Sequence, residues 1–94
     1  MTEWIHQLHS QSTDEAKETL VDYIERQVID IKKLPANARG KLDHNFMAIG
    51  FDSLMSIELL YRLQKDLGMA VDPEALESES VEQLAEFIYG LIRE

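Results

Sequence analysis

Apolar residues recur at intervals of three and four in three separate segments, and this spacing restricts the fold more than any other feature. The first segment lies between Ser12 and Pro35, the second over about 52–67 and the third over roughly 80–92. Such spacing predicts three helices, each with an apolar stripe that faces a core. No segment alternates in the manner of a strand, so we expect an all-α fold. The first and last stripes are Ala16, Leu20, Ile24, Val28 and Ile31, and Val81, Leu84, Ala85, Ile88 and Leu91.

Capping signals mark the ends of these helices. Ser12 followed by Glu15 is a capping-box pattern, and Asp52 and Ser80 stand where the second and last helices begin. Gly68 ends the second helix, because glycine readily adopts the left-handed conformation found after helices.

Two connections complete the predicted architecture. Asp72 and Pro73 open a short helical turn over residues 73–77. The connection 34–50 is rich in turn residues, and four apolar side chains are expected to anchor it: Leu42, Phe46, Met47 and Ile49. The sequence therefore predicts a small four-helix bundle with three main helices, one short helix and a long loop between the first two main helices.

The size and charge of the chain favour a binding or carrier module. Its 94 residues suit one small domain, taken here as residues 12–94, with 1–11 as an N-terminal extension or linker. Eighteen acids against nine bases argue against nucleic acid as a partner. No apolar run approaches the roughly 20 residues that span a bilayer, and no secretory signal is recognisable. We therefore expect a cytoplasmic protein without a membrane partner.

The second helix has two apolar stripes instead of one. Four leucines, Leu59, Leu60, Leu63 and Leu67, suit the core. Leu54, Ile57 and Tyr61 form the other stripe, with Met55 beside it. A domain this small cannot wrap a helix on all sides, so we assign the second stripe to a partner or ligand surface.

Ser53 stands at the first position of the second helix, after Gly50 and Asp52. The N-terminal end of a helix presents unpaired N–H groups and a positive dipole end, which suit a phosphate or phosphodiester. Asp52 could cap the helix and also help a modifying enzyme hold a metal ion. From the residues alone, a serine that only caps the helix is an equally ordinary explanation.

Residues 48–59, AIGFDSLMSIEL, resemble the attachment motif of acyl carrier proteins, particularly those of polyketide synthases. That motif reads Leu-Gly-x-Asp-Ser-Leu-x-x-x-Glu-Leu, and the similarity extends over residues 14–92. The resemblance implies a right-handed four-helix bundle. It also implies that a phosphopantetheinyl transferase attaches 4′-phosphopantetheine to Ser53, using coenzyme A and magnesium. The arm then carries acyl groups as thioesters, and the chain has no catalytic residue and no metal of its own.

The resemblance also implies partners. Leu54, Met55, Ile57 and Tyr61 lie where the family contacts its transferase, ketosynthase, acyltransferase and other synthase domains, and Glu58 takes the acidic position of that helix. The chain would then be a monomer or a domain of a larger synthase.

The departures from the motif bear on the subclass. Arg62 and Lys65 make the second helix less acidic than in fatty-acid carriers, which points to the polyketide class. Ile49 is a mild change from leucine, and residues 71–81 differ from the usual bacterial modular pattern. Phe51 stands where peptidyl carriers usually have glycine.

Several alternatives remain from the sequence. A peptidyl carrier protein of a nonribosomal peptide synthetase and an unmodified helical interaction domain both suit the pattern. A serine hydrolase does not, because no histidine follows position 44 to act as the base. His6, His9 and His44 lack further ligands at metal-binding spacing, so we expect surface histidines.

Overall fold

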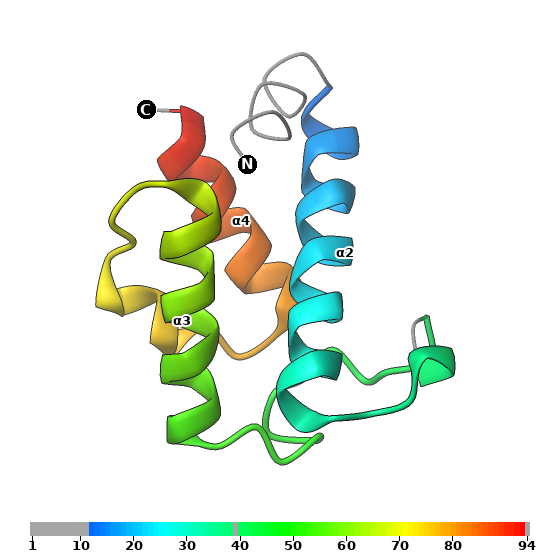
Figure 1. Cartoon of the computed structure of the whole chain (residues 1–94). Coiled ribbons are helices and arrows are strands. Elements are labelled where there is room, and N and C mark those ends of the chain that lie inside the picture. The colour runs from blue at the N-terminus through cyan, green and yellow to red at the C-terminus, as the bar shows by residue number, and fades with distance from the viewer. Residues whose placement is uncertain (1–11, 39, 94) are drawn as a thin grey trace.

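Three α-helices form the body of the molecule in the computed structural model, which describes residues 12–38 and 40–93 (Figure 1). The helices are α2 (Thr13–Lys32), α3 (Ser53–Leu67) and α4 (Val81–Arg93). Two short 3-10 helices, η1 (Ala36–Ala38) and η2 (Pro73–Glu77), lie in the connections. Within the described ranges there is no strand, only one isolated antiparallel bridge between Asn45 and Ser80. The predicted all-α architecture is confirmed, and η1 is an addition to it.

The predicted ends of α2 are confirmed. The Ser12 hydroxyl oxygen accepts the Glu15 N–H at 3.3 Å and donates to the Glu15 carboxylate at 3.0 Å. At the other end, Lys33 adopts a left-handed conformation with φ 58°, and the Leu34 N–H donates to the Ile29 carbonyl at 2.9 Å. These bonds satisfy backbone groups that a helix end leaves open, so α2 stops ahead of Pro35.

Side-chain and backbone caps also define α3 and α4. Gly68 follows α3 with φ 69° and donates its N–H to the Gln64 carbonyl at 3.0 Å. The Ser80 hydroxyl accepts the Gln83 N–H at 3.1 Å, and the Gln83 side chain accepts the Glu79 N–H at 2.8 Å. The predicted cap of the last helix is therefore present, and the Gln83 side chain bonds the residue that precedes Ser80.

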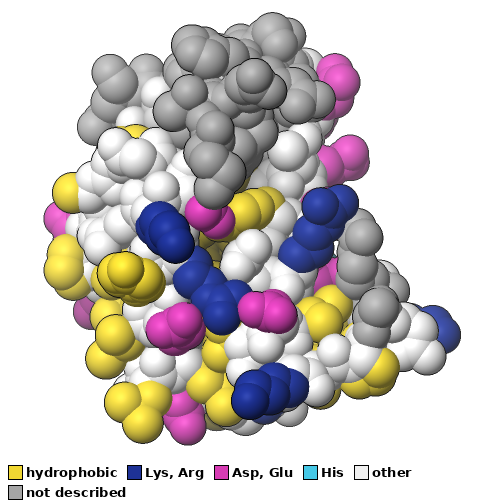
Figure 2. All heavy atoms as spheres, viewed as in Figure 1, with side chains coloured by type: hydrophobic (Ala, Val, Ile, Leu, Met, Phe, Trp, Pro, Cys, Tyr) yellow, Lys and Arg dark blue, Asp and Glu magenta, His cyan; other side chains and the backbone are white. Residues whose placement is uncertain are grey.

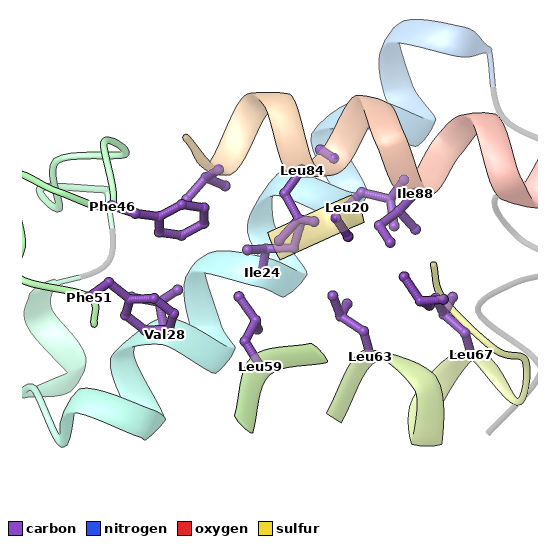
Figure 3. Close-up of a cluster of buried hydrophobic side chains, with 14 of the residues drawn as sticks. Leu20, Ile24, Val28, Phe46, Phe51, Leu59, Leu63, Leu67, Leu84 and Ile88 are labelled. Carbon is purple, nitrogen blue, oxygen red and sulfur yellow. The ribbon is translucent and has the colours of Figure 1, made fainter. Parts of the chain in front are cut away.

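One apolar core joins all three helices and the long loop (Figure 3). Its members include Leu20, Ile24 and Val28 of α2, Leu59, Leu63 and Leu67 of α3, Leu84 and Ile88 of α4, and Phe46 and Phe51 of the loop. Each fully buried side chain of this kind stabilises the fold by about 1.5–3 kcal/mol. Three residues predicted for the core, Ile31, Leu60 and Leu91, are only partly buried against it.

The long loop is anchored differently from the prediction. Phe46 is buried as expected, and Leu42 and Ile49 pack partly against the core. Met47 was expected to be an anchor, but this prediction is wrong because its side chain is 89% exposed. Phe51 takes that role: its N–H donates to the Phe46 carbonyl at 2.9 Å, and the two rings stack with centroids 5.2 Å apart.

The predicted extension 1–11, with His6 and His9, lies outside the described residues. Among the residues that the structure describes, no helix is both long enough and apolar enough to cross a membrane.

Candidate functional site

A tight turn leads the long loop into α3. The Ile49 N–H donates to the Asn45 carbonyl at 3.3 Å, and the Gly50 N–H donates to the Met47 carbonyl at 3.1 Å. Gly50 has φ 69°, a conformation that costs residues with a Cβ atom free energy. There is room for a Cβ atom, whose closest neighbour would be the Lys32 Nζ at 3.9 Å. The backbone conformation, and not crowding, therefore favours glycine here.

Ser53 is the first residue of α3 and is exposed. Asp52 precedes it as the N-cap, and its Oδ1 accepts the Met55 N–H at 2.9 Å. This arrangement confirms the predicted helix start and puts the Ser53 hydroxyl at the positive end of the helix dipole. An added phosphodiester would be favoured electrostatically at this position.

A surface hollow of about 550 Å³ opens beside Ser53. Its walls mix apolar and polar side chains, among them Met47, Ile57, Leu76, Ser56 and Ser78. A neighbouring pocket between the long loop, α3, η2 and α4 measures only about 20 Å³, which is room for about one water molecule. A group attached at Ser53 would therefore meet an open surface.

The second stripe of α3 is exposed, as predicted. The exposed fractions are 78% for Leu54, 55% for Ile57 and 61% for Tyr61. Figure 2 shows hydrophobic side chains gathered over the α3 side of the molecule. Met55 differs from this group, because it is partly buried and packs against the core.

Glu58 is exposed, and it belongs to an ion-pair network rather than standing alone. The Arg62 Nε donates to its carboxylate at 3.1 Å, and the Arg62 Nη1 donates to Asp30 at 2.6 Å and to Gln27 at 3.2 Å. The hydrogen bond to Asp30 is the main cause that raises the pKa of Arg62. Arg62 therefore links α3 to α2. From the sequence, Arg62 indicated only that the second helix is less acidic, and it did not predict this contact.

A second polar cluster joins the long loop to α2 and α4. His44 contacts Glu25 of α2 through Nε2 at 2.6 Å, and its Nδ1 contacts Glu82 of α4. Glu25 is buried, and its other oxygen accepts the Gly40 N–H at 2.8 Å. The sequence suggested only a surface histidine, and no local signal joins residues so far apart.

The cluster changes the proton affinity of its members. Burial lowers the pKa of His44, but the hydrogen bonds to Glu25 and Glu82 outweigh it and raise that pKa above its ordinary value. Burial raises the pKa of Glu25, while the bonds from His44 and Gly40 lower it, with a net decrease. Both shifts favour the charged forms of the pair.

The described residues contain no cluster of metal ligands. Within 12–38 and 40–93, no group of three or more His, Cys, Asp or Glu side chains is arranged to hold a metal ion.

Comparison with known proteins identifies a family. A family model described as the phosphopantetheine attachment site matches residues 20–88, a range that contains the Gly50 turn and all of α3. No curated protein matches the chain, and no solved structure does.

Proposed function

The chain belongs to the phosphopantetheine attachment family, and from this premise we propose an acyl carrier protein or domain of polyketide-synthase type with its arm on Ser53. Members of the family are non-catalytic carriers of covalently attached 4′-phosphopantetheine. They are modified by a phosphopantetheinyl transferase and interact with synthase enzymes. The carrier domain would span 12–94, with 1–11 as its extension.

The observation that supports Ser53 is its position. Its hydroxyl is exposed at the first residue of α3, directly after the Gly50 turn and the Asp52 cap. No rearrangement of the core is needed for a transferase to reach this oxygen, because the hollow beside it is open. The dipole of α3 then stabilises the negative charge of the product.

Loading is a substitution at phosphorus. The Ser53 oxygen forms a bond to the phosphorus of coenzyme A that bears the pantetheine, and the bond from that phosphorus to the bridging oxygen breaks. The nucleotide leaves as 3′,5′-adenosine diphosphate, and the hydroxyl proton passes to a base of the transferase. Gly50 forms the turn and Asp52 the cap of this site, and Asp52 would also help the transferase hold its magnesium ion. When bound, the arm supplies a terminal thiol that carries acyl groups as thioesters.

One feature supports the polyketide type, and a second supports contact with synthase partners. Phe51 packs into the core beside Phe46, so the position where peptidyl carriers have glycine serves a structural purpose in this chain. The exposed stripe of Leu54, Ile57 and Tyr61 provides the apolar contact surface for the transferase, ketosynthase and acyltransferase. Glu58 adds an acid at its edge, and the half-buried Met55 contributes less than the other three.

Intact-mass measurement tests the proposal. The chain is incubated with coenzyme A, magnesium and a phosphopantetheinyl transferase of broad specificity, beside the Ser53→Ala and Ser56→Ala variants. We expect the wild type and Ser56→Ala to gain one phosphopantetheinyl group and Ser53→Ala to gain none. Ser56 is the matched control because it lies in the same helix and lines the same hollow. A gain in Ser53→Ala would refute the attachment site.

The loaded protein then distinguishes the subclasses. A polyketide carrier accepts an acyl group from an acyltransferase, whereas a peptidyl carrier accepts an aminoacyl group from an adenylating partner. A folded chain that gains no arm with any transferase would instead be the unmodified interaction domain.

A further inference from the structure

His44 is held between two carboxylates from different helices. Its Nε2 lies 2.6 Å from the Glu25 carboxylate of α2, and its Nδ1 lies within hydrogen-bond distance of the Glu82 carboxylate of α4. A neutral imidazole has one N–H, so it can donate to only one of them. The Gly40 N–H donates to the other oxygen of Glu25 at 2.8 Å. His44 can therefore donate to both carboxylates only as the doubly protonated imidazolium.

His44 also belongs to a short segment that pairs with the start of α4. Its carbonyl accepts the Val81 N–H at 2.8 Å, and the Phe46 N–H donates to the Glu79 carbonyl at 3.0 Å. The Phe46 carbonyl in turn accepts the Phe51 N–H at 2.9 Å, and Phe51 directly precedes the Asp52 cap. A continuous series of contacts thus runs from the imidazolium to the start of α3.

We infer that imidazolium His44 is a positioning residue for the loading of Ser53, because it fastens the long loop to α2 and α4 and so holds the turn that presents the serine. This inference rests on the proposed attachment at Ser53. His44 itself touches neither the reacting atoms nor the arm, and acts through Phe46 and Phe51.

The charges around His44 determine how pH acts on it. On its own loop Asp43 is adjacent, on α4 the contact is Glu82, and the same side of α2 carries Lys17, Glu18, Asp22 and Glu25. Lys17 also contacts Glu86 at 3.4 Å. Burial lowers the pKa of His44, but the hydrogen bonds and charges of Glu25 and Glu82 outweigh it and raise that pKa. Its contacts are complete below the ordinary histidine pKa and are lost as pH rises through the raised value.

The test compares loading rates across pH. kcat/KM for transfer from coenzyme A is measured for the wild type, His44→Gln, Glu82→Gln and Glu86→Gln between about pH 6 and about pH 9. At each pH, the kcat/KM of the wild type is divided by that of the variant, and this ratio cancels the pH dependence of the transferase. For His44→Gln and Glu82→Gln we expect a ratio of about ten at the acidic end, the size of one charge-assisted hydrogen bond, falling toward one at the alkaline end. Glu86→Gln is the matched control, because it removes a carboxylate of the same helix, α4, that lies outside the His44 cluster and contacts Lys17.

Two further measurements keep the outcomes separate. Ring ¹⁵N shifts of His44 report the imidazolium directly, and circular dichroism shows whether each variant is folded. A ratio that does not vary with pH, or a Glu82→Gln value equal to that of Glu86→Gln, would overturn the inference. A neutral ring at about pH 6 would overturn it as well. If the wild type itself acquires no arm, the proposed function fails, and the ring shifts still decide whether the imidazolium contacts exist.

Discussion

Gly50 and Gly90 are exposed glycines in opposite backbone states. Gly50 lies in the turn before α3 with φ 69°, whereas Gly90 lies within α4 and has a helical conformation. Neither position is crowded, since a Cβ atom at Gly50 would come no closer than 3.9 Å to a neighbour and one at Gly90 would meet nothing within 4 Å. Conformation alone therefore decides what alanine does at each site.

We predict that the two alanine substitutions have opposite signs. Gly50→Ala should lower the free energy of unfolding by about 1–2 kcal/mol, because alanine is strained in the left-handed region. Gly90→Ala should raise it by about 0.5–1 kcal/mol, because glycine within a helix is less favourable than alanine. Urea unfolding of both variants, with equal m values, measures the differences. A stabilised Gly50→Ala would show that the turn relaxes to another conformation.

For single residues, the sequence predicts a position in a turn or cap more reliably than it predicts burial. The places of Gly50 in the turn, Asp52 at the cap and Ser53 at the first position of α3 could be predicted, because they depend on neighbours within three residues. Met47 and Phe51 could not be told apart, since both are apolar loop residues next to the same turn. Which of them is buried depends on how the turn returns to Phe46, and that is a tertiary property.

The two apolar stripes of α3 differ in their exposure. Leu63 is 1% exposed and contacts the shared core, whereas Leu54 is 78% exposed at the start of the same helix. The two side chains are chemically identical, so they give a matched pair for separating stability from recognition.

We predict that Leu63→Ala lowers the free energy of unfolding by about 2–5 kcal/mol, through lost burial and a residual cavity. Leu54→Ala should change it by less than about 0.5 kcal/mol, because that side chain is mostly in water. For the loading reaction, Leu54→Ala should raise KM with little change in kcat, as expected when a contact made equally in the ground and transition states is lost. Thermal unfolding and loading kinetics on the two variants measure both effects. An unchanged KM would remove Leu54 from the transferase surface.

The helix ends could be predicted from the sequence, but the contacts between elements could not. The caps at Ser12, Asp52 and Gly68 act within one helical turn, so their patterns are local. The contacts of His44 with Glu25 and Glu82 span 19 and 38 residues. No periodicity relates such positions, and a histidine in a loop has no signal that distinguishes a cluster from an exposed site.

The molecule as a whole carries a formal net charge of −9, and this charge complicates any pH study. Acidification protonates carboxylates and reduces repulsion throughout the fold, while individual ion pairs are lost at the same time. The contribution of one cluster therefore appears only as the difference between the wild type and a variant that lacks it, because the general charge effect is nearly the same in both.

For the cluster of Glu25, His44 and Glu82, we predict a stability difference confined to a pH window. The pKa of His44 in the folded chain is above its ordinary 6.5, so its stabilisation is complete below about pH 6.5 and is lost as pH rises through the raised value. The pKa of Glu25 is below its ordinary 4.5, so its contribution is present above about pH 4.5 and is lost as pH falls through the lowered value. The free energy of unfolding of the wild type minus that of His44→Gln should therefore be largest between these two ordinary values and decline on both sides. Urea midpoints measured at closely spaced pH values give this difference, with Glu86→Gln as the control for removing an α4 carboxylate outside the cluster. A difference that grows toward alkaline pH would mean that the folded protein prefers neutral His44, and the imidazolium would then have no part in holding the loop.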